Sequence, residues 1–593
     1  MPSSNTTTTT TTSTSEDELL APYDVTEPVV INEDGDNIEI RIHFNGRLVA
    51  LHRRSSDDVD QVLKRMRLSM EKSSSKKKKH QKASCPIEIH LKFMDGQGHA
   101  LASSDGPTGE GAAEPLLLGS IVANTKAVSV NEEVFPVAHN IPTIEALALK
   151  LYTFARYPVF PQVECSNVNP DDLVYEYYDD DGELVHAGKV FFPSDDLIGK
   201  KIKVVAYHSQ WPQTSRRESP YSRAVLPSPS IGTFRDRRLP RALEPTDPTH
   251  LRVASFNVLG QRHIRTPLEP IFYHVRDCKE VVDFDYRAPL LMRELLDVKA
   301  DVAAFQEADT RFMDAAASAM PDYTLWLAED KGRESEGNKG RRGEGCGLAF
   351  RKDRFEEVGR SMLELGSDGL LEEFTAEEIA TLQRRWAGVD IFKDVFDNLG
   401  MVAQLLTLRD RSTSRLYIVG NTHLYHSPKA PHVKILQTHM IMKALERLMA
   451  EHPQAIPVFC GDLNSSSPAE AVVDYFTTGD IPADHRDWRN GPYFTWSNRE
   501  CEGIDRPTTK GPLGIHLHHG VKCLAHVPEE GYTNAVCGWK GIIDHIFYDR
   551  YHLRPLWSLP ILSDADVESC NGALPYKCYG SDHVMITTEF KTL

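Results

Sequence analysis

Hydrophobic and polar residues alternate from Ile38 to Phe44, which predicts a β-strand closed by a turn at Asn45-Gly46. Between Val59 and Met66 the apolar residues instead recur at helical spacing, so a helix is expected there. Alternation returns over residues 87–93 and predicts another strand. The chain therefore opens with a mixed but mainly β pattern.

Short β patterns dominate residues 121–207. The most regular are residues 173–178 and 202–206, and the acidic stretch 179–182 ends in glycine, as a turn between strands does. The pattern predicts a small β-sandwich. The acids of the turn lack the alternating spacing of a calcium-binding loop, so a metal is not expected there.

Pro, Ser and Arg dominate residues 211–249, a composition that predicts a linker. Beyond it, strand-like runs alternate with amphipathic helices, as in α/β or α+β enzymes layered around sheets. We therefore predict four parts: a disordered Ser/Thr-rich tail over 1–20, a β-containing region over 21–210, the linker over 211–249 and an α/β domain over 250–593.

Charge and composition exclude several classes of protein. The 593 residues include 67 Lys+Arg and 85 Asp+Glu, a net charge of −18, which speaks against a protein that coats nucleic acid by bulk charge. Ten Cys without a CxxC pair form neither a disulfide scaffold nor a zinc ribbon and suit a reducing compartment. The basic run Lys76–Lys79 predicts a solvated loop, with an RNA-tethering or nuclear-import patch as the alternative.

The first residues have neither the basic and apolar regions of a secretory signal nor the Arg-rich character of a mitochondrial transit peptide. No apolar run reaches the roughly 20 residues that span a bilayer. We therefore expect no membrane association, and the default prediction for the compartment is the cytoplasm.

Five segments after the predicted linker share one pattern, an apolar run that ends in an acid, amide or imidazole side chain. They cover residues 251–259, 301–307, 416–423, 456–464 and 541–547, and residues 580–583 add an Asp-His pair. A single acid after an apolar run is usually a turn or helix cap. Several such strand ends in one domain instead predict a site assembled at one edge of a sheet.

The residue types in these segments predict a hard cation. Carboxylate and amide oxygens without thiolates suit Mg²⁺ or Mn²⁺. Glu307 is a candidate ligand, and Asp462 and Asn464, two positions apart, would point to the same side of an extended segment. The pair Asp582-His583 could supply an oriented imidazole for proton transfer.

In this order, the motifs resemble the deadenylase-like branch of the endonuclease/exonuclease/phosphatase superfamily. They are Ser255–Leu259, Phe305–Glu307, Thr422–Tyr425, Gly461–Ser465 and Ser581–His583. A long β-containing region before them, and Tyr532-Thr533-Asn534 ahead of Asp544, resemble the 2′,5′-phosphodiesterases of that branch. The resemblance implies a two-sheet α/β sandwich flanked by helices, preceded by a smaller, mostly β domain.

The resemblance also implies roles for individual residues. Glu307 would be the principal metal ligand, and Asp462 and Asn464 would bind or orient the metal and the attacking water. His423 would contact the scissile phosphate, and Asn257 would lie near the metal-bound phosphate. Three residues would complete the metal and proton-transfer set: Asp544, Asp582 and His583.

In related deadenylases an aromatic residue and a proline enclose the terminal adenine. Trp539 and Pro428 occupy the matching positions here, and stacking on one aromatic face is worth about 1–3 kcal/mol per base. The alternative for Trp539 is a core tryptophan beside a strand. Residues 425–428 read Tyr-His-Ser-Pro where the family has Tyr-Trp-His-Pro, a departure close to the phosphate.

The resemblance implies a Mg²⁺-dependent phosphodiesterase or 3′-exoribonuclease, with Mn²⁺ as an alternative cofactor. Its substrate would be 2′,5′-linked oligoadenylate or the poly(A) end of RNA, released as AMP, and a mitochondrial location would follow from the family alone. One alternative is a superfamily phosphatase that acts on lipid or inositol phosphates. Another is a catalytically inactive RNA-binding scaffold, although no matched metal ligand is missing.

Overall fold

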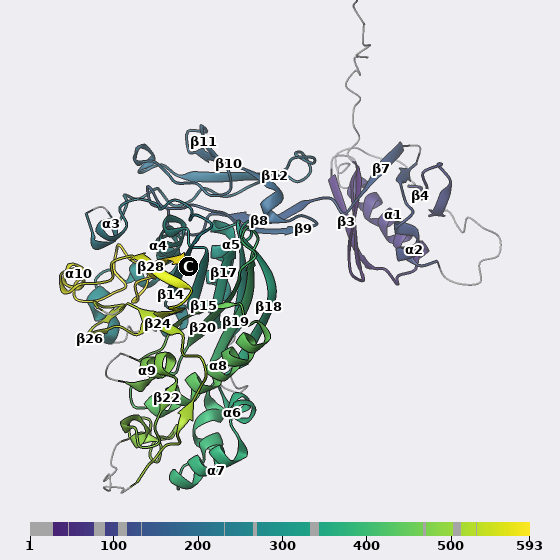
Figure 1. Ribbon diagram of the computed structural model, residues 1–593. Helices are drawn as coiled ribbons and strands as arrows, with labels where there is room; N and C mark the ends of the chain where they lie inside the picture. Colours follow the sequence, from purple (N-terminus) through teal and green to yellow (C-terminus); the bar gives the residue numbers. More distant parts are fainter. Residues whose placement is uncertain are drawn as a thin grey trace, which may run out of the picture. The chain divides into compact units, whose positions relative to one another are not determined.

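Figure 1 shows the computed structural model, which describes residues 28–44, 47–75, 89–104, 116–131, 133–230, 232–264, 270–331, 343–465, 470–501, 511–528 and 530–593. The predicted tail over 1–20 and the run Lys76–Lys79 lie outside these residues. Contacts divide the chain into two compact units. The first comprises Met1–Thr143, Cys165–Asn169 and Gln210–Ser215, and the second comprises Ile144–Glu164, Pro170–Ser209 and Arg216–Leu593.

The first unit contains one mixed seven-stranded sheet. Its order is β3-β2-β1-β7-β6-β4-β5, with the bounds β1 Val29–Asp34, β2 Asn37–Phe44, β3 Arg47–Arg54, β4 Leu91–Met94, β5 Ala100–Ser103, β6 Ala127–Val130 and β7 Glu133–His139. The alternating isoleucines of β2 are buried in one core with apolar residues of α1 (Val59–Ser75) and α2 (Leu118–Val122). The predicted strand over 38–44 and the helix that begins at Val59 are thereby confirmed.

Residues 143–218 form small sheets of their own. Strand β8 (Thr143–Ala148) pairs with β9 (Gln162–Ser166), and a four-stranded sheet has the order β11-β10-β12-β13. Its bounds are β10 Leu173–Asp179, β11 Leu184–Ala187, β12 Ile202–His208 and β13 Arg217–Glu218. Both regular strands predicted here exist, but residues 121–207 do not form one sandwich, because β6 and β7 pair within the seven-stranded sheet.

The segment predicted as a linker is partly buried. Within it, α3 (Phe234–Arg238) packs in the second unit, where Arg235 binds Glu294 at 2.6 Å and Asp297 at 2.5 Å. Both carboxylates lie on α4 (Phe284–Val298). An Arg-rich composition suggests solvent exposure and therefore a linker. In the folded chain, tertiary contacts instead supply buried partners for these arginines. The domain boundaries themselves stay predictions.

Two six-stranded sheets form the centre of the second unit. The first has the order β16-β17-β15-β14-β29-β28, with the bounds β14 His250–Asn257, β15 Val302–Asp309, β16 Tyr323–Glu329, β17 Glu344–Arg351, β28 Leu553–Ser558 and β29 Ile586–Thr592. The second has the order β18-β19-β20-β21-β27-β24, with the bounds β18 Phe355–Glu364, β19 Val402–Asp410, β20 Leu416–His423, β21 Ile456–Asp462, β24 Leu524–Val527 and β27 Asp544–Asp549.

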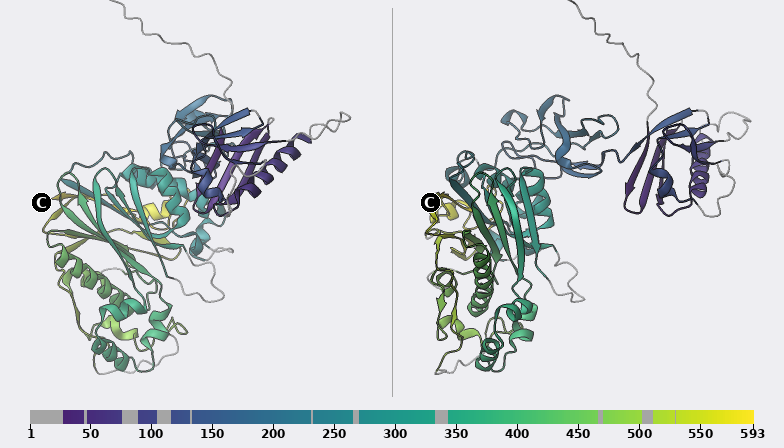
Figure 2. Two further views of the ribbon diagram at one scale, coloured as in Figure 1. Left: turned by 90° about the vertical axis from the view of Figure 1, so that its right-hand side faces the viewer. Right: turned by 45° about the vertical axis from the view of Figure 1, so that its right-hand side comes forward.

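The two sheets pack face to face around a shared apolar core, and helices cover their outer faces (Figure 2). Helices α4 and α5 (Thr310–Ala319) cover the first sheet, and α8 (Pro431–Glu451) and α9 (Ala471–Thr478) cover the second. The predicted two-sheet α/β sandwich flanked by helices is confirmed. The remaining elements are α6 Ser367–Glu373, α7 Ala376–Arg385, α10 Asp564–Ser569, β22 Asp480–Ile481, β23 Leu517–His518, β25 Asn534–Val536 and β26 Trp539–Gly541.

A buried polar network joins the sheets beneath one end of their central strands. The amide nitrogen of Gln306 donates to Asn421 Oδ1 at 2.8 Å, and Asn421 Nδ2 donates to the Phe305 and Gly347 carbonyls at 2.9 and 2.8 Å. Both amide side chains are fully buried. This network holds β15 against β20 and so sets the spacing of the strand ends above it.

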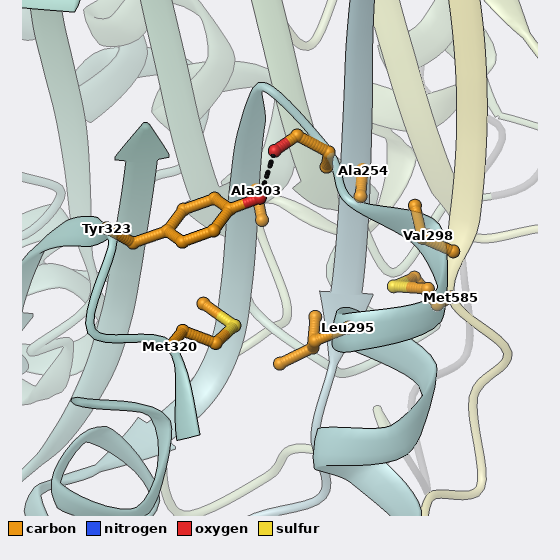
Figure 3. Close-up of a pocket in the computed structure, with 8 residues that line it drawn as sticks. Ala254, Leu295, Val298, Ala303, Met320, Tyr323 and Met585 are labelled. Carbon is orange, nitrogen blue, oxygen red and sulfur yellow. Dashed lines mark hydrogen bonds between the residues drawn. The ribbon is translucent and has the colours of Figure 1, made fainter. Parts of the chain in front are cut away.

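Within the described part of the chain, no helix combines the length and apolar character needed to cross a membrane. One apolar pocket lies between the first sheet and α4 (Figure 3), lined by Ala254, Leu295, Val298, Ala300, Ala303, Met320, Tyr323 and Met585. The Tyr323 hydroxyl donates to the Ala300 carbonyl at 2.6 Å. This lining includes neither a carboxylate nor a histidine, so the pocket is a packing feature.

Acid should destabilise the protein through His432, near the start of α8. This ring is fully buried against Trp386 and Phe494, and neither ring nitrogen has a hydrogen-bond partner among the described residues. Burial lowers the pKa of His432 to about 3. Below about pH 6.5 this histidine binds a proton in the unfolded chain but not in the folded chain. The free energy of unfolding should therefore fall by about 2 kcal/mol when the pH is lowered from 7 to 5. Urea unfolding of wild type and His432→Phe at both pH values measures the difference, and equal losses would contradict it.

Candidate active site

The ends of strands from both sheets meet at one edge of the sandwich. In the parallel pair β20 and β21, His423 lies opposite Asp462, and Asp462 lies opposite Asp544 at the start of β27. In the first sheet, Asn257 at the end of β14 lies opposite Gln306 of β15. The five predicted strand segments therefore deliver polar side chains to one place.

Glu307 enters the site from a bulge. Between Phe305 and Ala308, β15 has one more residue than its partner β17, and Glu307 has a φ of 56°. A left-handed backbone is rare for such a residue and costs on the order of 1–3 kcal/mol, and bulges can re-aim a side chain. Its carboxylate accepts hydrogen bonds from Asn257 Nδ2 at 3.0 Å and from the Gly260 amide at 2.8 Å. The bulge thus turns Glu307 toward the strand ends.

The charge of Glu307 is set by its neighbours. Burial alone would raise the pKa of Glu307, but the nearby imidazoles of His263 and His423 and the hydrogen bond from Asn257 lower it to about 2. The carboxylate is therefore ionised and ready to receive a cation. Asn257 also donates to Asp462 Oδ2 at 2.9 Å, so one amide spaces the two carboxylates.

Asp462, Asp544 and His583 form a compact buried cluster. His583 Nδ1 lies 2.8 Å from Asp544 Oδ2, and His583 Nε2 lies 3.7 Å from Asp462 Oδ2. Burial and the charge of Asp544 raise the pKa of Asp462. Burial lowers the pKa of His583, but the charge of Asp544 and two further carboxylates outweigh it and raise it well above the usual range. The imidazole is thus held as a cation by the carboxylates around it.

Asn464 reaches the site differently from the prediction. Strand β21 ends at Asp462, and Asn464 has a left-handed φ of 48°, so the two side chains do not share one side of an extended segment. The Asn464 amide nitrogen instead lies 2.9 Å from His423 Nε2 and donates to the Leu424 carbonyl at 3.0 Å. Asn464 therefore orients His423, whose Nε2 is 3.6 Å from Asp462 Oδ2.

Asp582 is buried beside the cluster, but it is not the hydrogen-bonded partner of His583. Its carboxylate lies 3.4 Å from Ser581 Oγ, and burial raises the pKa of Asp582. The orienting carboxylate is Asp544, 39 residues away in the chain. The sequence suggested that Asp582 orients His583, because the two residues are adjacent. The antiparallel placement of β27 instead brings Asp544 to that imidazole.

Sequence reasoning missed a second acidic group at this edge. His263 Nε2 lies 2.9 Å from Glu344 Oε1 and 3.6 Å from Glu307 Oε2, and Arg262 Nε lies 2.6 Å from Glu344 Oε2. The charge of Glu307 raises the pKa of His263 to about 9. One sequence feature could have identified this acidic group: Glu344 stands at the start of an apolar strand, β17, which pairs directly with β15.

The predicted base-binding residues are both exposed. Trp539 opens strand β26 with 46% of its surface exposed, so it is not a core tryptophan. Pro428 is exposed in the loop that follows β20. Strand β25, the partner of β26, is tied to the site because Asn534 bridges to His583. That Trp539 and Pro428 enclose a base stays a prediction.

The residues at this edge fit a hard divalent cation. One ligand atom each from Asp462, Asp544 and His583 lies within 4.8 Å of the others, and the same holds for His263, Glu307 and Glu344. Asp544 Oδ1 is buried without a hydrogen-bond partner among the described residues, and such an oxygen is costly unless a ligand satisfies it. Carboxylate and amide oxygens without thiolate suit Mg²⁺ or Mn²⁺, and the protonated imidazoles of His263 and His583 would not be ligands.

Gly260 should be required for this geometry. A Cβ at this position would lie 2.4 Å from Glu344 Oε2 and 3.3 Å from the Glu307 carbonyl. Because Arg262 and His263 hold that carboxylate, Gly260→Ala should shift the loop and lower kcat by about 100-fold, the cost of a misplacement near 1 Å. Steady-state kinetics on an oligonucleotide substrate check this. Gly359→Ala, where a Cβ meets nothing within 4 Å, is the control, and equal kcat values for both variants would refute the requirement.

The sequence profile of the Endonuclease/Exonuclease/phosphatase family matches residues 254–583, and the chain belongs to this family. The human protein 2′,5′-phosphodiesterase 12 is 23% identical over 587 residues, which cover 91% of this chain and 90% of that protein. The Xenopus laevis CCR4-NOT transcription complex subunit 6-like-B is 25% identical over 339 residues, 52% of this chain and 59% of that protein. The structure of the human Nocturnin catalytic domain with bound sulfate covers 60% of this chain and 98% of that one, at 17% identity and a TM-score of 0.39. The predicted family resemblance is confirmed.

Proposed function

We propose that the chain is a divalent-metal-dependent phosphodiesterase that hydrolyses adenosine oligonucleotides and releases AMP. Its substrate is 2′,5′-linked oligoadenylate or the poly(A) end of RNA. The observation that carries the proposal is the convergence of Glu307, Asp462, Asp544 and His583 at one edge, with an ionised carboxylate and a cationic imidazole. The similarity to a 2′,5′-phosphodiesterase along 91% of the chain supports it.

In the proposed mechanism, Glu307 and Asp462 hold Mg²⁺, with Mn²⁺ as a substitute. When bound, the cation withdraws charge from a phosphate oxygen of the scissile diester. His423, oriented by Asn464, contacts the phosphate and stabilises its developing charge. Asn257 keeps the two carboxylates apart at the phosphate side.

Proton transfer is assigned to the buried pair. Asp544 fixes His583 through Nδ1, so that Nε2 points toward Asp462. A water attacks phosphorus in line and gives a proton to Asp462, whose pKa is raised by burial and by the charge of Asp544. The bond from phosphorus to the ribose oxygen breaks, and that oxygen takes a proton from the cationic His583, which regains one from Asp462, 3.7 Å away. Asp582 maintains the negative potential that keeps His583 protonated.

One assay tests the proposal: purified protein with Mg²⁺ is given 2′,5′-triadenylate, 3′,5′-oligo(A) and a 3′,5′-oligo(U) control. AMP release from either adenosine substrate, abolished by EDTA, is expected. Hydrolysis of phosphoinositides or inositol phosphates but not of oligonucleotides would replace the proposal with the phosphatase alternative. Oligonucleotide binding without turnover in Mg²⁺ or Mn²⁺ would support the inactive scaffold.

Trp539 should select adenine. Because stacking on one aromatic face is worth about 1–3 kcal/mol, Trp539→Ala should lower kcat/KM on oligo(A) by about 10- to 100-fold. The control is Tyr551→Ala, which removes another exposed aromatic ring, 68% exposed, in the turn that follows the end of β27 away from Asp544. An unchanged preference for oligo(A) over oligo(U) in Trp539→Ala would exclude the adenine clamp.

A further inference from the structure

Arg287, on the first turn of α4, is fully buried, yet no carboxylate among the described residues forms an ion pair with it. All five of its N–H groups donate to neutral oxygens. The acceptors are the carbonyls of Val282 (3.2 Å), Val258 (3.0 Å), Gly580 (2.9 Å) and Leu259 (2.9 Å) and the side-chain oxygen of Gln261 (3.1 Å). An arginine has five such donors, so its hydrogen-bonding capacity is fully used.

Four of these five acceptors belong to the two loops that carry the candidate site; Val282 does not. Val258 and Leu259 directly follow Asn257 at the end of β14, and Gly580 directly precedes Ser581-Asp582-His583. A single guanidinium nitrogen, Nη1, binds the Val258 and Gly580 carbonyls together. Arg287 therefore clamps loops that are more than 300 residues apart in the chain.

The clamp reaches Glu307 through one peptide group. The Leu259 carbonyl accepts from Arg287, and the amide of the same peptide, Gly260 N–H, donates to Glu307 Oε2 at 2.8 Å. Leu259 has a φ of 57°, a conformation that surrounding contacts must hold. The guanidinium thus fixes the orientation of a peptide dipole whose other end binds the principal candidate metal ligand.

On the other side, the clamp reaches His583. Ser581, next to Gly580, donates through Oγ to the Asn257 carbonyl at 2.7 Å and accepts from the His583 amide at 3.2 Å. The buried cation is balanced at longer range by Asp582, Asp309 and Glu307. A neutral or shorter side chain at position 287 would leave both loops without this connection.

We propose that Arg287 is a positioning residue that holds the Glu307 and His583 sides of the site in register for cation binding and catalysis. The proposal rests on the proposed function for its kinetic readout. Residues that orient metal ligands typically change metal affinity or activity by 10- to 100-fold when replaced. Lysine at this position keeps the charge but offers donors from one atom only, so it cannot reach both loops in the same way.

The test compares Arg287→Lys with the wild type in two measurements. Mn²⁺ binding to the folded protein, followed by electron paramagnetic resonance, should weaken by about 10- to 100-fold, and kcat on oligo(A) should fall by a similar factor with KM nearly unchanged. Arg235→Lys is the matched control, because Arg235 is equally buried on an adjacent helix but binds carboxylates of α4. It should lower the melting temperature without changing Mn²⁺ affinity.

Equal Mn²⁺ affinity in wild type and folded Arg287→Lys would overturn the proposal, as would equal changes in the Arg235→Lys control. If Arg287→Lys does not fold, Gln261→Ala removes only one of the five acceptors and should weaken Mn²⁺ binding by a few-fold; no change there would also overturn it. A wild type that binds Mn²⁺ but hydrolyses none of the three oligonucleotides would defeat the proposed function alone, since the Mn²⁺ measurement still decides the role of Arg287.

Discussion

Replacing Glu307 by Gln or Asp462 by Asn is expected to lower kcat/KM by about 1,000-fold or more, because several kcal/mol of charge stabilisation at the phosphate would be lost. For Asp462→Asn, stability should not fall with activity. Five carboxylates crowd this edge, those of Glu307, Glu344, Asp462, Asp544 and Asp582, and burial together with the charge of Asp544 already raises the pKa of Asp462. A neutral amide at 462 should therefore leave the melting temperature unchanged or raise it, the pattern of a site that trades stability for function.

Initial rates with Mg²⁺ on oligo(A) and thermal melts of the metal-free proteins measure the two effects. Glu356→Gln is the control, since Glu356 lies on an outer strand with half of its side chain exposed. Retained Mg²⁺-dependent cleavage in either site variant would overturn the assignment of these carboxylates. Loss of activity that only accompanies unfolding would show a structural role instead.

The second large effect concerns stability at the opposite end of the strands. Asp301, directly before β15, is fully buried and accepts from Thr246 Oγ1 at 2.7 Å and from the Arg252 amide at 2.8 Å. It also pairs with Arg354 at 2.8 Å, which precedes β18 of the other sheet. Asp301→Ala removes one of the two buried carboxylates of Arg354, which keeps Asp410 at 2.9 Å, and it leaves Thr246 Oγ1 and the Arg252 amide without this acceptor. Together these losses should lower the free energy of unfolding by about 3–5 kcal/mol.

Urea unfolding measures this loss. Asp353→Ala is the matched control, because Asp353 pairs with Arg351 at 2.6 Å but its side chain is 63% exposed, so the loss there should stay below about 1 kcal/mol. Folded Asp301→Ala should keep its specific activity, since Asp301 lies at the end of β15 away from Glu307. A change below about 1 kcal/mol for Asp301→Ala would contradict the buried network.

The strands that end at the site could be predicted because period-two and continuous apolar patterns are local properties. The predicted runs that end near Asn257, Glu307, His423 and Asp462 are β14, β15, β20 and β21. Local composition failed where long-range contacts decide. The composition of residues 234–238 is that of a linker, but in the fold Arg235 forms ion pairs with carboxylates of α4.

The candidate site, too, could be predicted only in part from the sequence. The candidate residues were identifiable because each is a polar side chain at the end of an apolar run, but their pairings were not. Asp544 rather than Asp582 orients His583, and Asn464 turns to His423 through a left-handed backbone. Neither arrangement leaves a signal in residue spacing.

By itself, the sequence determined the class of fold, the family and the set of polar strand ends, since these follow from short-range patterns and motifs. Only the tertiary structure decided which carboxylate faces which imidazole, that a bulge turns Glu307 into the site, and that the buried Arg287 joins two loops far apart in the chain. The physical reason is that hydrogen bonds and charge interactions act over a few ångströms in space. The register of paired strands brings such groups together from distant parts of the chain.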